Sequence, residues 1–455
     1  MGDSKVRSIV VGLATAAVYL GCSSGSGTNS NNSNPPSCPT TTTGPTVHSA
    51  DVASSQTWTA AASPHVVTQG ISVLAGATLT IEACASVQLA AGASIDVHGG
   101  TLLAQGTSDK LITFGAKDPM PWNNLRVDYP GTASLAYATL SGGGGQTTTF
   151  EEGATLVISA TNPVSSVAPL VKVDHVTIQG SVGFGVLGDV FGGFTADSQQ
   201  LIITGCGKGL AASPYPISMY FSPAGTVPSG TYTGNQVDEI QVRTGPAVAE
   251  SFTLHARGVP YRMEGGSSAS YAVASATLGG TPAVLTIEAG VTLRFGSGAR
   301  LTIGGGANAD PAMGFPGTLI AVGTASSPIV FTSSSATPAA GDWVGLEFAA
   351  TTTPGNDLEY VSIDYAGGPC SCSGFSCLPM GTDDNAALKI FNWDPPASFL
   401  TNSSILHSAG HGVIRGWSAA TGPDFLPSNT FDVAECKETL FRDQYGHCPD
   451  PPPCP

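Results

Sequence analysis

The sequence predicts an all-β protein: a right-handed single-stranded parallel β-helix, or solenoid, built from two tandem homologous units. Three observations point to this fold, namely a stretch that occurs twice, short apolar pairs at a fixed spacing, and small turn-forming residues between the pairs. The first copy is "LTIEACASVQLAAGASIDV" (79–97) and the second is "LTIEAGVTLRFGSGARLTI" (285–303). The chain shows no amphipathic helical pattern of any length.

Each copy contains three apolar pairs, with one residue between the members of a pair and eight positions between successive pairs. The pairs are Leu79/Ile81, Val87/Leu89 and Ile95/Val97 in the first copy, and Leu285/Ile287, Leu293/Phe295 and Leu301/Ile303 in the second. A gap of two places both side chains on one face of a strand, so we expect Leu79, Ile81, Leu285 and Ile287 to point inward. Three such strands make one rung of about 24 residues, and every third strand stacks on the rung below.

This period predicts where the next inward residues lie. After Leu79 the next is expected near position 103, and "GGTLLAQG" supplies Leu102 and Leu103. In the second copy the equivalent "GTLIAVG" brings Leu319, ten residues later than the period requires. The segment "ANADPAMGFP" (307–316) explains this delay if it forms a loop on one corner of the solenoid.

The predicted organisation follows from these copies and from shifts in composition. It comprises a signal peptide (1–21), a disordered Ser/Thr/Asn/Pro tether (22–50), a first β-helix unit (51–235), a second unit (236–430) with a Cys-rich insertion (369–381), and a Cys/Pro-rich C-terminal tail (431–455). The strings "GATLTIEA" and "GTLLAQGTSDKLITF" resemble those of right-handed parallel β-helix repeat surface lipoproteins of bacteria, relatives in fold of the pectate lyases. The resemblance covers roughly residues 60–420; it implies the fold and says little about activity.

The composition restricts the partners of the protein. Its formal net charge is -16, and only 11% of its residues are charged. Such a surface repels phosphate backbones, so we expect no nucleic-acid partner. Acidic polysaccharides are disfavoured as well, unless a cation bridges them. Hydrophobic residues make up 41% of the chain, enough for a substantial core despite its 58 glycines and 33 prolines.

The N-terminus predicts export. Lys5 and Arg7 precede an apolar run (8–21) that is too short to span a bilayer and fits a signal peptide. The run ends in "YLGC", which resembles the bacterial lipobox, although Tyr19 stands where Leu is usual. The resemblance implies that Cys22 is lipidated; the alternative is an ordinary signal peptide with an incidental cysteine.

The Gly/Ser/Asn/Thr/Pro-rich residues that follow (23–46) cannot fold and would hold a domain off a membrane. By the sorting pattern of enteric bacteria, Ser23 implies the outer membrane. We therefore expect a lipid-anchored protein of the bacterial outer membrane or cell surface.

Nine further cysteines occur in a chain that we expect to be exported, where disulfides persist. The disulfide candidates are Cys370, Cys372, Cys377, Cys436, Cys448 and Cys454, whereas Cys38, Cys84 and Cys206 are scattered. The alternative is a zinc site made by the first three with His447 or His407, but the C-x-C-x4-C spacing is not a known zinc knuckle. The odd count leaves at least one thiol free or paired with another molecule.

The two units allow residues of the fold to be separated from candidate binding residues. Residues present at matching positions of both units are explained by the shared fold; they are Glu82/Glu288, Trp122/Trp343 and Tyr137/Tyr360. The second unit alone carries Glu359 and Asp364, where the first has Ala136 and Ser141. These two carboxylates are therefore our candidates for ligand binding.

One constellation suggests an enzyme. The order of Asp383, Asp384, "GHG" with His411, and Arg415 resembles that of polygalacturonases, inverting hydrolases that work with paired carboxylates. The upstream Asn-Thr-Asp element of that family and its following Lys are missing. The alternative is structural, because "NSSILHSAGHGVIRG" has the same form as "DHVTIQGSVGFGVLG" and places His411 where Phe184 stands, in a turn of a rung.

We therefore predict a non-catalytic β-helix surface protein for cell-surface structure, adhesion or glycan binding, whose partners are a membrane, through the lipid anchor, and a surface polysaccharide or another surface protein. The alternative is a polysaccharide lyase or an inverting glycoside hydrolase of the pectin-active type. We expect no cofactor. Calcium is the alternative that stays open, although a calcium site needs clustered carboxylates and no motif supplies them. Function does not follow from fold, so the preference rests on missing catalytic residues and on analogy.

Overall fold

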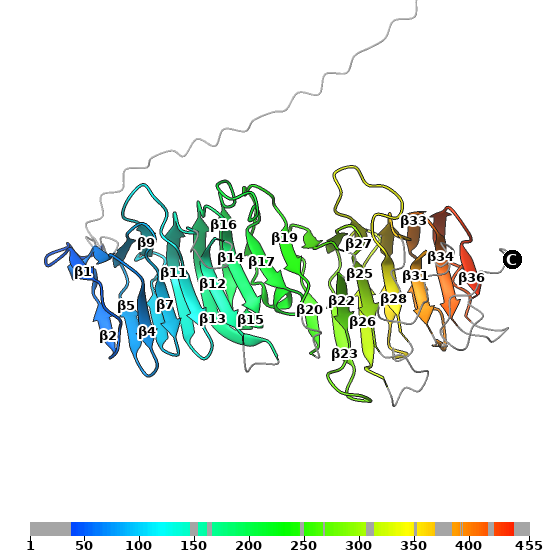
Figure 1. Ribbon diagram of the computed structural model, residues 1–455, viewed down its shortest axis with the longest axis horizontal. Helices are drawn as coiled ribbons and strands as arrows, with labels where there is room; N and C mark the ends of the chain where they lie inside the picture. Colours follow the sequence, from blue (N-terminus) through cyan, green and yellow to red (C-terminus); the bar gives the residue numbers. More distant parts are fainter. Residues whose placement is uncertain are drawn as a thin grey trace, which may run out of the picture. The chain divides into compact units, whose positions relative to one another are not determined.

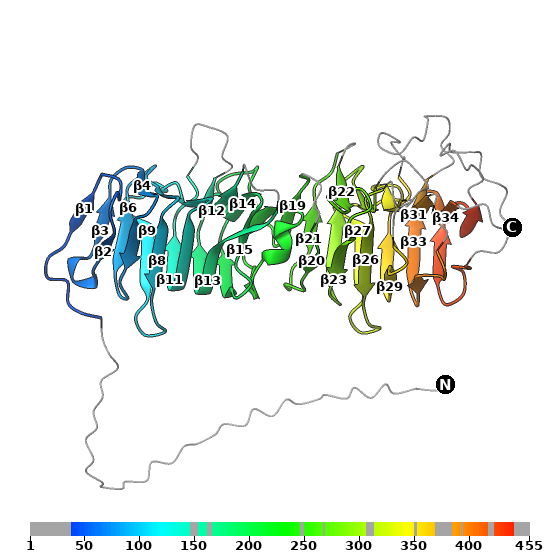
Figure 2. The same ribbon diagram turned by 90° about the horizontal axis from the view of Figure 1, so that it is seen from below.

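The computed structural model is built from stacked parallel β-strands. It describes residues 38–145, 153–161, 166–245, 250–266, 269–305, 314–349, 353–368, 385–391, 393, 395–416 and 423–440. In these residues the strands form four sheets, and all pairings between the named strands that we discuss are parallel. Figures 1 and 2 show that the strands follow one another along the stack in sequence order. The fold is thus a right-handed parallel β-helix, as predicted.

The elements have the following bounds. The 12-stranded sheet of the described residues contains β1 (Thr46–His48), β2 (Gln56–Trp58), β3 (His65–Val67), β5 (Thr78–Ile81), β6 (Ser86–Leu89), β8 (Thr101–Gln105), β9 (Ile112–Ala116), β11 (Thr132–Ser141), β13 (Ala168–Gln179), β15 (Gly192–Phe194), β16 (Gln199–Thr204) and β18 (Gly230–Thr231). The 13-stranded sheet of the same residues contains β4 (Ile71–Leu74), β7 (Ile95–His98), β10 (Leu125–Asp128), β12 (Ala154–Ala160), β14 (Phe184–Val190), β17 (Ile217–Tyr220), β19 (Ile240–Arg243), β21 (Tyr261–Met263), β24 (Thr292–Phe295), β27 (Ile329–Ser333), β30 (Val361–Asp364), β33 (Ser404–Ser408) and β35 (Thr430–Val433).

Two smaller sheets complete the set that the described ranges contain. One consists of β20 (Phe252–Leu254), β23 (Ala283–Ile287), β26 (Gly317–Val322), β29 (Asp357–Glu359) and β32 (Leu400–Thr401). The other consists of β22 (Ser270–Val273), β25 (Arg300–Ile303), β28 (Gly345–Phe348), β31 (Ala386–Phe391), β34 (His411–Gly416) and β36 (Glu438–Leu440). Two 3₁₀ turns are η1 (Ala60–Ala62) and η2 (Pro223–Thr226).

The register confirms the period that the sequence predicts. Leu79 of β5 lies beside Leu102 of β8, and Leu285 of β23 lies beside Leu319 of β26 despite the longer loop between them. Successive strands β5, β6 and β7 each pair with the strands three before and three after them. The three apolar pairs of one copy therefore lie on three different faces of the solenoid.

The inward side chains form one continuous core. Leu79, Ile81, Leu285 and Ile287 are each at most 1% exposed, as predicted. They belong to a single apolar cluster that extends from Val52 near the start of the solenoid to its last rungs. Because each rung buries its apolar residues against the rungs on both sides, stability is distributed along the stack and depends on neighbouring rungs.

The sheets are interrupted between the two copies. The 12-stranded sheet ends at β18, and the 5-stranded and 6-stranded sheets begin at β20 and β22. Within the described residues, the 13-stranded sheet is the one that runs through this region, by way of β17, β19 and β21. We call residues 216–260, between the two sets of sheets, the junction.

The 13-stranded sheet also joins strands that do not correspond in the two copies. On the first side of the junction it contains β7, which carries the third apolar pair, Ile95 and Val97. On the second side it contains β24, which carries the second pair, Leu293 and Phe295. The junction therefore offsets the second copy from the first by one face of the solenoid. Sequence similarity predicts the two units; it does not predict this offset.

Residues that match between the copies occupy the same local geometry. Trp122 and Trp343 are both 0% exposed, and their Nε1 atoms donate over 2.8 Å to the carbonyls of Ser141 and Asp364. Tyr137 and Tyr360 are another pair at matching positions of the two copies, and their backbone φ angles are +46° and +49°. This left-handed conformation turns the chain sharply from one face to the next. Such residues serve the fold, as their presence in both copies suggests.

The solenoid begins earlier and ends later than the sequence indicates. The predicted tether reaches residue 50, yet β1 pairs with β3 through Val47 and Val66. The predicted tail starts at residue 431, yet β36 pairs with β34 and extends the stack to Leu440. Both corrections have the same cause, since a short polar strand stays in the stack when a neighbouring strand satisfies its backbone hydrogen bonds.

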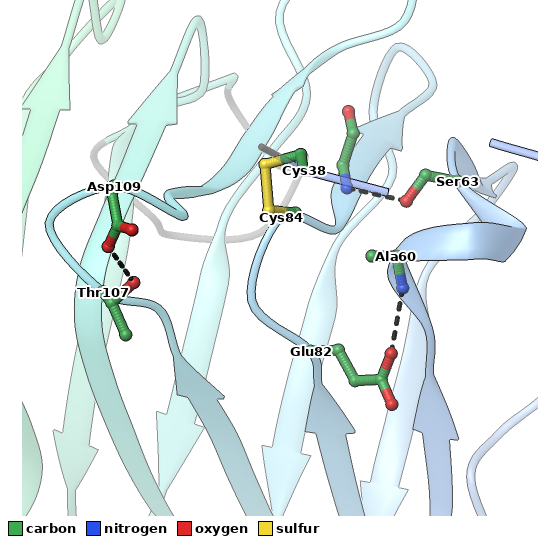
Figure 3. Close-up of a disulfide and its surroundings, with 8 residues drawn as sticks. Cys38, Ala60, Ser63, Glu82, Cys84, Thr107 and Asp109 are labelled. Atoms are coloured by element: carbon green, nitrogen blue, oxygen red, sulfur yellow. Dashed lines mark hydrogen bonds between the residues drawn. A yellow bond between two sulfur atoms is a disulfide. The ribbon is translucent and has the colours of Figure 1, made fainter. Parts of the chain in front are cut away.

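A disulfide joins the first described residue, Cys38, to the rung that contains β5 and β6. Cys38 is bonded to Cys84, which lies in the turn between β5 and β6 with φ of +72° (Figure 3). Two residues earlier, the Glu82 carboxylate accepts the amide of Ala60 over 3.1 Å. Sequence spacing did not indicate this pair, because Cys38 and Cys84 lie apart from the two cysteine clusters. The bond connects Cys38 directly to the turn between β5 and β6.

Replacing Cys84 by Ser should loosen the first rungs. The two cysteines are 46 residues apart, and closing a loop of that length is worth about 4 kcal/mol in the chain-entropy model. We expect faster hydrogen exchange of the amides of β1 and β3, measured by mass spectrometry, with little change beyond β11. Cys38→Ser should behave alike, and the double variant should add nothing. Additive losses would show that the two cysteines act separately.

The first rungs also contain a stack of three rings that should sense pH. The rings of His48, Trp58 and His65 all contact one another: the His48 centroid is 3.9 Å from that of Trp58 and 5.2 Å from that of His65, and the Trp58 and His65 centroids are also 5.2 Å apart. Nε2 of His48 is 3.0 Å from Nδ1 of His65. Burial, together with repulsion from His65, lowers the pKa of His48 from 6.5 to about 4. Burial also lowers the pKa of His65, against the opposing influence of the Thr59 carbonyl and of Glu82.

A histidine whose pKa is lower in the folded state stabilises that state above its unfolded pKa. We therefore expect the full stability of this end above pH 6.5 and a loss of roughly 1–3 kcal/mol as the pH falls towards 4. Chemical denaturation at pH 7, 5.5 and 4.5 measures this effect. The variant His48→Phe keeps a ring on Trp58 and should flatten the profile between these values. An unchanged profile would assign the acid sensitivity to other groups.

Candidate functional site

The histidine of the enzyme-like constellation is buried in the solenoid. His411 is the first residue of β34, not a turn residue as the sequence suggests, and it is 4% exposed. Its Nδ1 accepts the amide of Cys436 over 3.1 Å, and its carbonyl accepts the Ser408 hydroxyl over 3.0 Å. Ser181 donates to the Phe184 carbonyl in the same manner over 2.5 Å. His411 thus fills a structural position that Phe184 fills in the first copy.

Of the remaining members of the constellation, Arg415 is the one that the structure describes. Asp383 and Asp384 lie outside the described residues. Arg415 is 2.5 Å from the Glu438 carboxylate and donates from Nη1 to the Pro423 carbonyl. Burial raises the pKa of Glu438, and the nearby Arg415 opposes this effect. These contacts connect β34, which contains Arg415, to Glu438 of β36 and to Pro423.

The two predicted binding carboxylates lie on different faces. Glu359 ends β29 and accepts the amide group of Asn402 over 3.1 Å. Asp364 ends β30 in another sheet, and Ser362 donates to it over 3.0 Å. Burial raises the pKa of Asp364, while the hydrogen bond from Ser362 lowers it in part. Because Tyr360 turns the chain between them, the structure does not bring these carboxylates into one site.

Most of the predicted disulfide cysteines lie outside the part of the chain that the structure describes. They are Cys370, Cys372, Cys377, Cys448 and Cys454. His447, a suggested zinc ligand, lies outside it as well. Cys436 is disulfide-bonded. Cys206 is a free, buried thiol, and burial raises its pKa to about 11. His407, the other suggested zinc ligand, is stacked on Tyr365 and lies 3.8 Å from the Asp432 carboxylate.

Among the described residues, no three His, Cys, Asp or Glu side chains are grouped as they are in metal sites. These residues also contain no helix that is long and apolar enough to cross a membrane. The arrangement that the structure does bring together is at the junction.

A pocket of about 360 Å³ lies at the junction, between the end of one set of sheets and the start of the next. We call it the junction pocket; its lining includes Val167, Phe194, Thr226, Val227, His255 and Arg257. Phe194 comes from β15 and Thr226 from η2, whereas His255 and Arg257 follow β20. The pocket exists because the 12-stranded sheet stops here and η2 packs between β15 and β20.

Two polar side chains of the junction pocket are held in fixed orientations. His255 Nδ1 is 2.7 Å from the Glu288 carboxylate, whose other oxygen accepts the amide of Ala256 over 2.9 Å. Burial acts to raise the pKa of Glu288, but these hydrogen bonds outweigh it and the pKa lies below its usual value. Arg257 donates from Nε to the Val227 carbonyl over 2.8 Å. Both side chains are therefore oriented before any ligand arrives.

Comparison of the two copies separates the structural part of this pocket from the rest. Glu82 accepts the amide of Ala60 as Glu288 accepts that of Ala256, so the carboxylate serves the fold in both copies. His255 and Arg257 flank Ala256, and the residues that flank Ala60 are Thr59 and Ala61. These two side chains are particular to the second copy. Neither residue belongs to a motif that the sequence repeats in both copies, so no pattern pointed to them.

The comparison with known proteins agrees with the fold. A family model described as a pectate-lyase-like beta helix domain matches residues 266–357. No curated protein and no solved structure matches the chain.

Proposed function

Because the chain is a parallel β-helix repeat protein, we propose that it is a non-catalytic surface protein that binds glycans or other surface molecules. A family-model match to a pectate-lyase-like domain concerns the scaffold, on which both enzymes and binding proteins are built. The choice between them depends on the side chains that the scaffold presents.

The observation that carries the proposal is the burial of His411. A general acid or base must come within hydrogen-bonding distance of the reacting group. His411 is 4% exposed, and its Nδ1 already accepts a backbone amide. Removing this ring would expose an unsatisfied amide and a cavity, so its effect should be on stability and not on chemistry.

A polar row on the 13-stranded sheet supports a binding role. Gln241, Arg262, Arg294 and Thr332 are consecutive neighbours across four strands. The two arginine side chains are 32% and 30% exposed, and both contact the Glu239 carboxylate, which is only 6% exposed. A carboxylate held between two guanidinium groups fixes their positions. Fixed polar groups lose little entropy when they bind hydroxyl-rich ligands.

A glycan array tests this function. We expect the purified protein to bind surface polysaccharides with and without calcium, and to release no reducing ends from pectin-type or other acidic glycans. Thr332→Glu adds a carboxylate to the polar row and should weaken the array signal at least fivefold. Thr113→Glu makes the same change at an exposed position of β9, on another sheet, and should have no effect.

Opposite outcomes would favour the enzyme. Turnover that Asp384→Asn abolishes while the melting temperature is unchanged would make Asp384 part of an inverting hydrolase. His411→Ala should lower the melting temperature and leave glycan binding intact at temperatures where it is folded. An array that shows no glycan bound above background would refute the glycan-binding role.

We propose further that Cys22 anchors the protein by lipid in the outer membrane or at the cell surface. The support is the lipobox-like "YLGC" and the polar segment after it. Labelled palmitate should enter the wild-type protein, and Cys22→Ser should release it from the membrane fraction. Cys206→Ser, which removes a buried thiol, is the matched control and should remain labelled. A wild-type protein without label would exclude the anchor.

A further inference from the structure

We propose that the junction pocket binds a small hydroxylated monocarboxylate, a molecule about the size of a sugar acid. This role is separate from the binding of polymeric glycans proposed above. It rests on the juxtaposition of Arg257 and His255, both from the segment after β20, in a pocket of about 360 Å³ whose lining also includes Phe194 of β15.

Arg257 would recognise the carboxylate. Its hydrogen bond to the Val227 carbonyl uses Nε, and this leaves the two Nη atoms for a ligand in the pocket that the side chain lines. Two parallel N–H groups match the two oxygens of a carboxylate. Burial raises the pKa values of Tyr232 and Tyr261, and the positive charge of Arg257 lies close enough to oppose this in both. The guanidinium is therefore close to both of these buried phenol groups.

His255 would recognise a hydroxyl group of the same ligand. The ionised Glu288 can only accept a hydrogen bond, so Nδ1 of His255 carries the proton in their 2.7 Å contact. In a neutral imidazole the other nitrogen, Nε2, is then an acceptor. An acceptor beside a guanidinium suits a ligand that carries both a carboxylate and a hydroxyl group.

The rest of the pocket limits the size and charge of the ligand. Its volume is at the lower end of the range for ligand pockets, roughly 300–1,000 Å³, which suits one small molecule and not a polymer. Val227 and Pro228 offer an apolar wall for C–H groups. The net charge of -16 opposes polyanions. One carboxylate, neutralised by one arginine, meets these conditions.

Calorimetry with D-gluconate and D-glucitol tests the proposal on the purified full chain. The two probes have the same carbon skeleton and differ at one end, which is a carboxylate in the first and an alcohol in the second. We expect saturable binding of D-gluconate and at least tenfold weaker binding of D-glucitol. Equal affinities, or no saturable binding of D-gluconate, would overturn the proposal.

Three variants locate the site. Arg257→Gln removes the charge and should weaken D-gluconate binding at least tenfold. Ala196→Trp places a large ring at an exposed position of the pocket lining, and it should block binding without lowering the melting temperature. Lys172→Gln removes a cation that pairs with Asp197 and does not line the pocket, and it should leave binding unchanged. Binding that survives both Arg257→Gln and Ala196→Trp would place the ligand elsewhere.

These measurements are independent of the glycan array. If the array is positive and D-gluconate does not bind, the glycan-binding role stands and the pocket assignment fails. If D-gluconate binds and the array is empty, the reverse holds. A purely structural role of Arg257, as a tie between η2 and the segment after β20, predicts a lower melting temperature with unchanged D-gluconate affinity in folded Arg257→Gln.

Discussion

Ile287→Asp should leave the protein unable to fold. Ile287 is 1% exposed and lies between Leu254 of the preceding rung and Ala321 of the following one. An aspartate there would bury an unpaired charge at a cost of several kcal/mol, comparable with the whole stability of an ordinary domain. Circular dichroism and limited proteolysis should show loss of the β-structure of the second copy.

The neighbouring position provides the control for this variant. Thr286 alternates with Ile287 along β23 and is partly exposed, so Thr286→Asp should fold and melt within a few degrees of the wild type. A folded, protease-resistant Ile287→Asp protein would contradict the inward orientation of this strand.

Trp343→Ala should lower the free energy of unfolding by about 3–5 kcal/mol, the usual range for removal of a buried tryptophan. The ring is 0% exposed, is stacked on Phe295 with centroids 4.2 Å apart, and donates to the Asp364 carbonyl. Trp343→Phe keeps an aromatic ring and loses the hydrogen bond, so it should cost about 1 kcal/mol more than the packing change alone. Urea denaturation measures both values.

Trp122 is the matched control for this prediction. It makes the same hydrogen bond in the first copy, to the Ser141 carbonyl, and Trp122→Phe should lose a similar amount. A tryptophan used to stack a sugar would behave differently. If Trp343→Ala retained its stability and lost only its glycan-array signal, the structural assignment of this residue would be wrong.

The sequence predicted the rungs well because burial and period constrain each other. An inward residue must recur at each rung, so the period from Leu79 leads to Leu102 and Leu103, of which Leu102 is the buried one. Leu319 stands ten residues later than the period requires, and the similarity of "GTLIAVG" to "GTLLAQG" identifies it. The repeat also aligns His411 with Phe184, although it suggested a turn and the residue begins β34. In these cases one apolar pattern determines the register, and the register determines which side chains are buried.

The junction could not be predicted because its features depend on long-range pairing. No apolar period indicates that β19 should connect β17 to β21, or that two sheets should stop. His255 and Arg257 form a pocket only because η2 packs against the start of the second copy. The Cys38–Cys84 disulfide could not be predicted either. A disulfide requires two chain segments to lie close together, and sequence spacing does not give that distance.

The offset of the two copies by one face has a consequence for how the molecule meets its surroundings. Two copies in phase would present matching sides in one direction and could both lie on the same flat surface, with the gain in avidity that two linked contacts give. Here β7 continues into β24 and not into β25, its counterpart in the second copy. Matching sides therefore look in different directions, and any contact that both copies make would connect two separate surfaces.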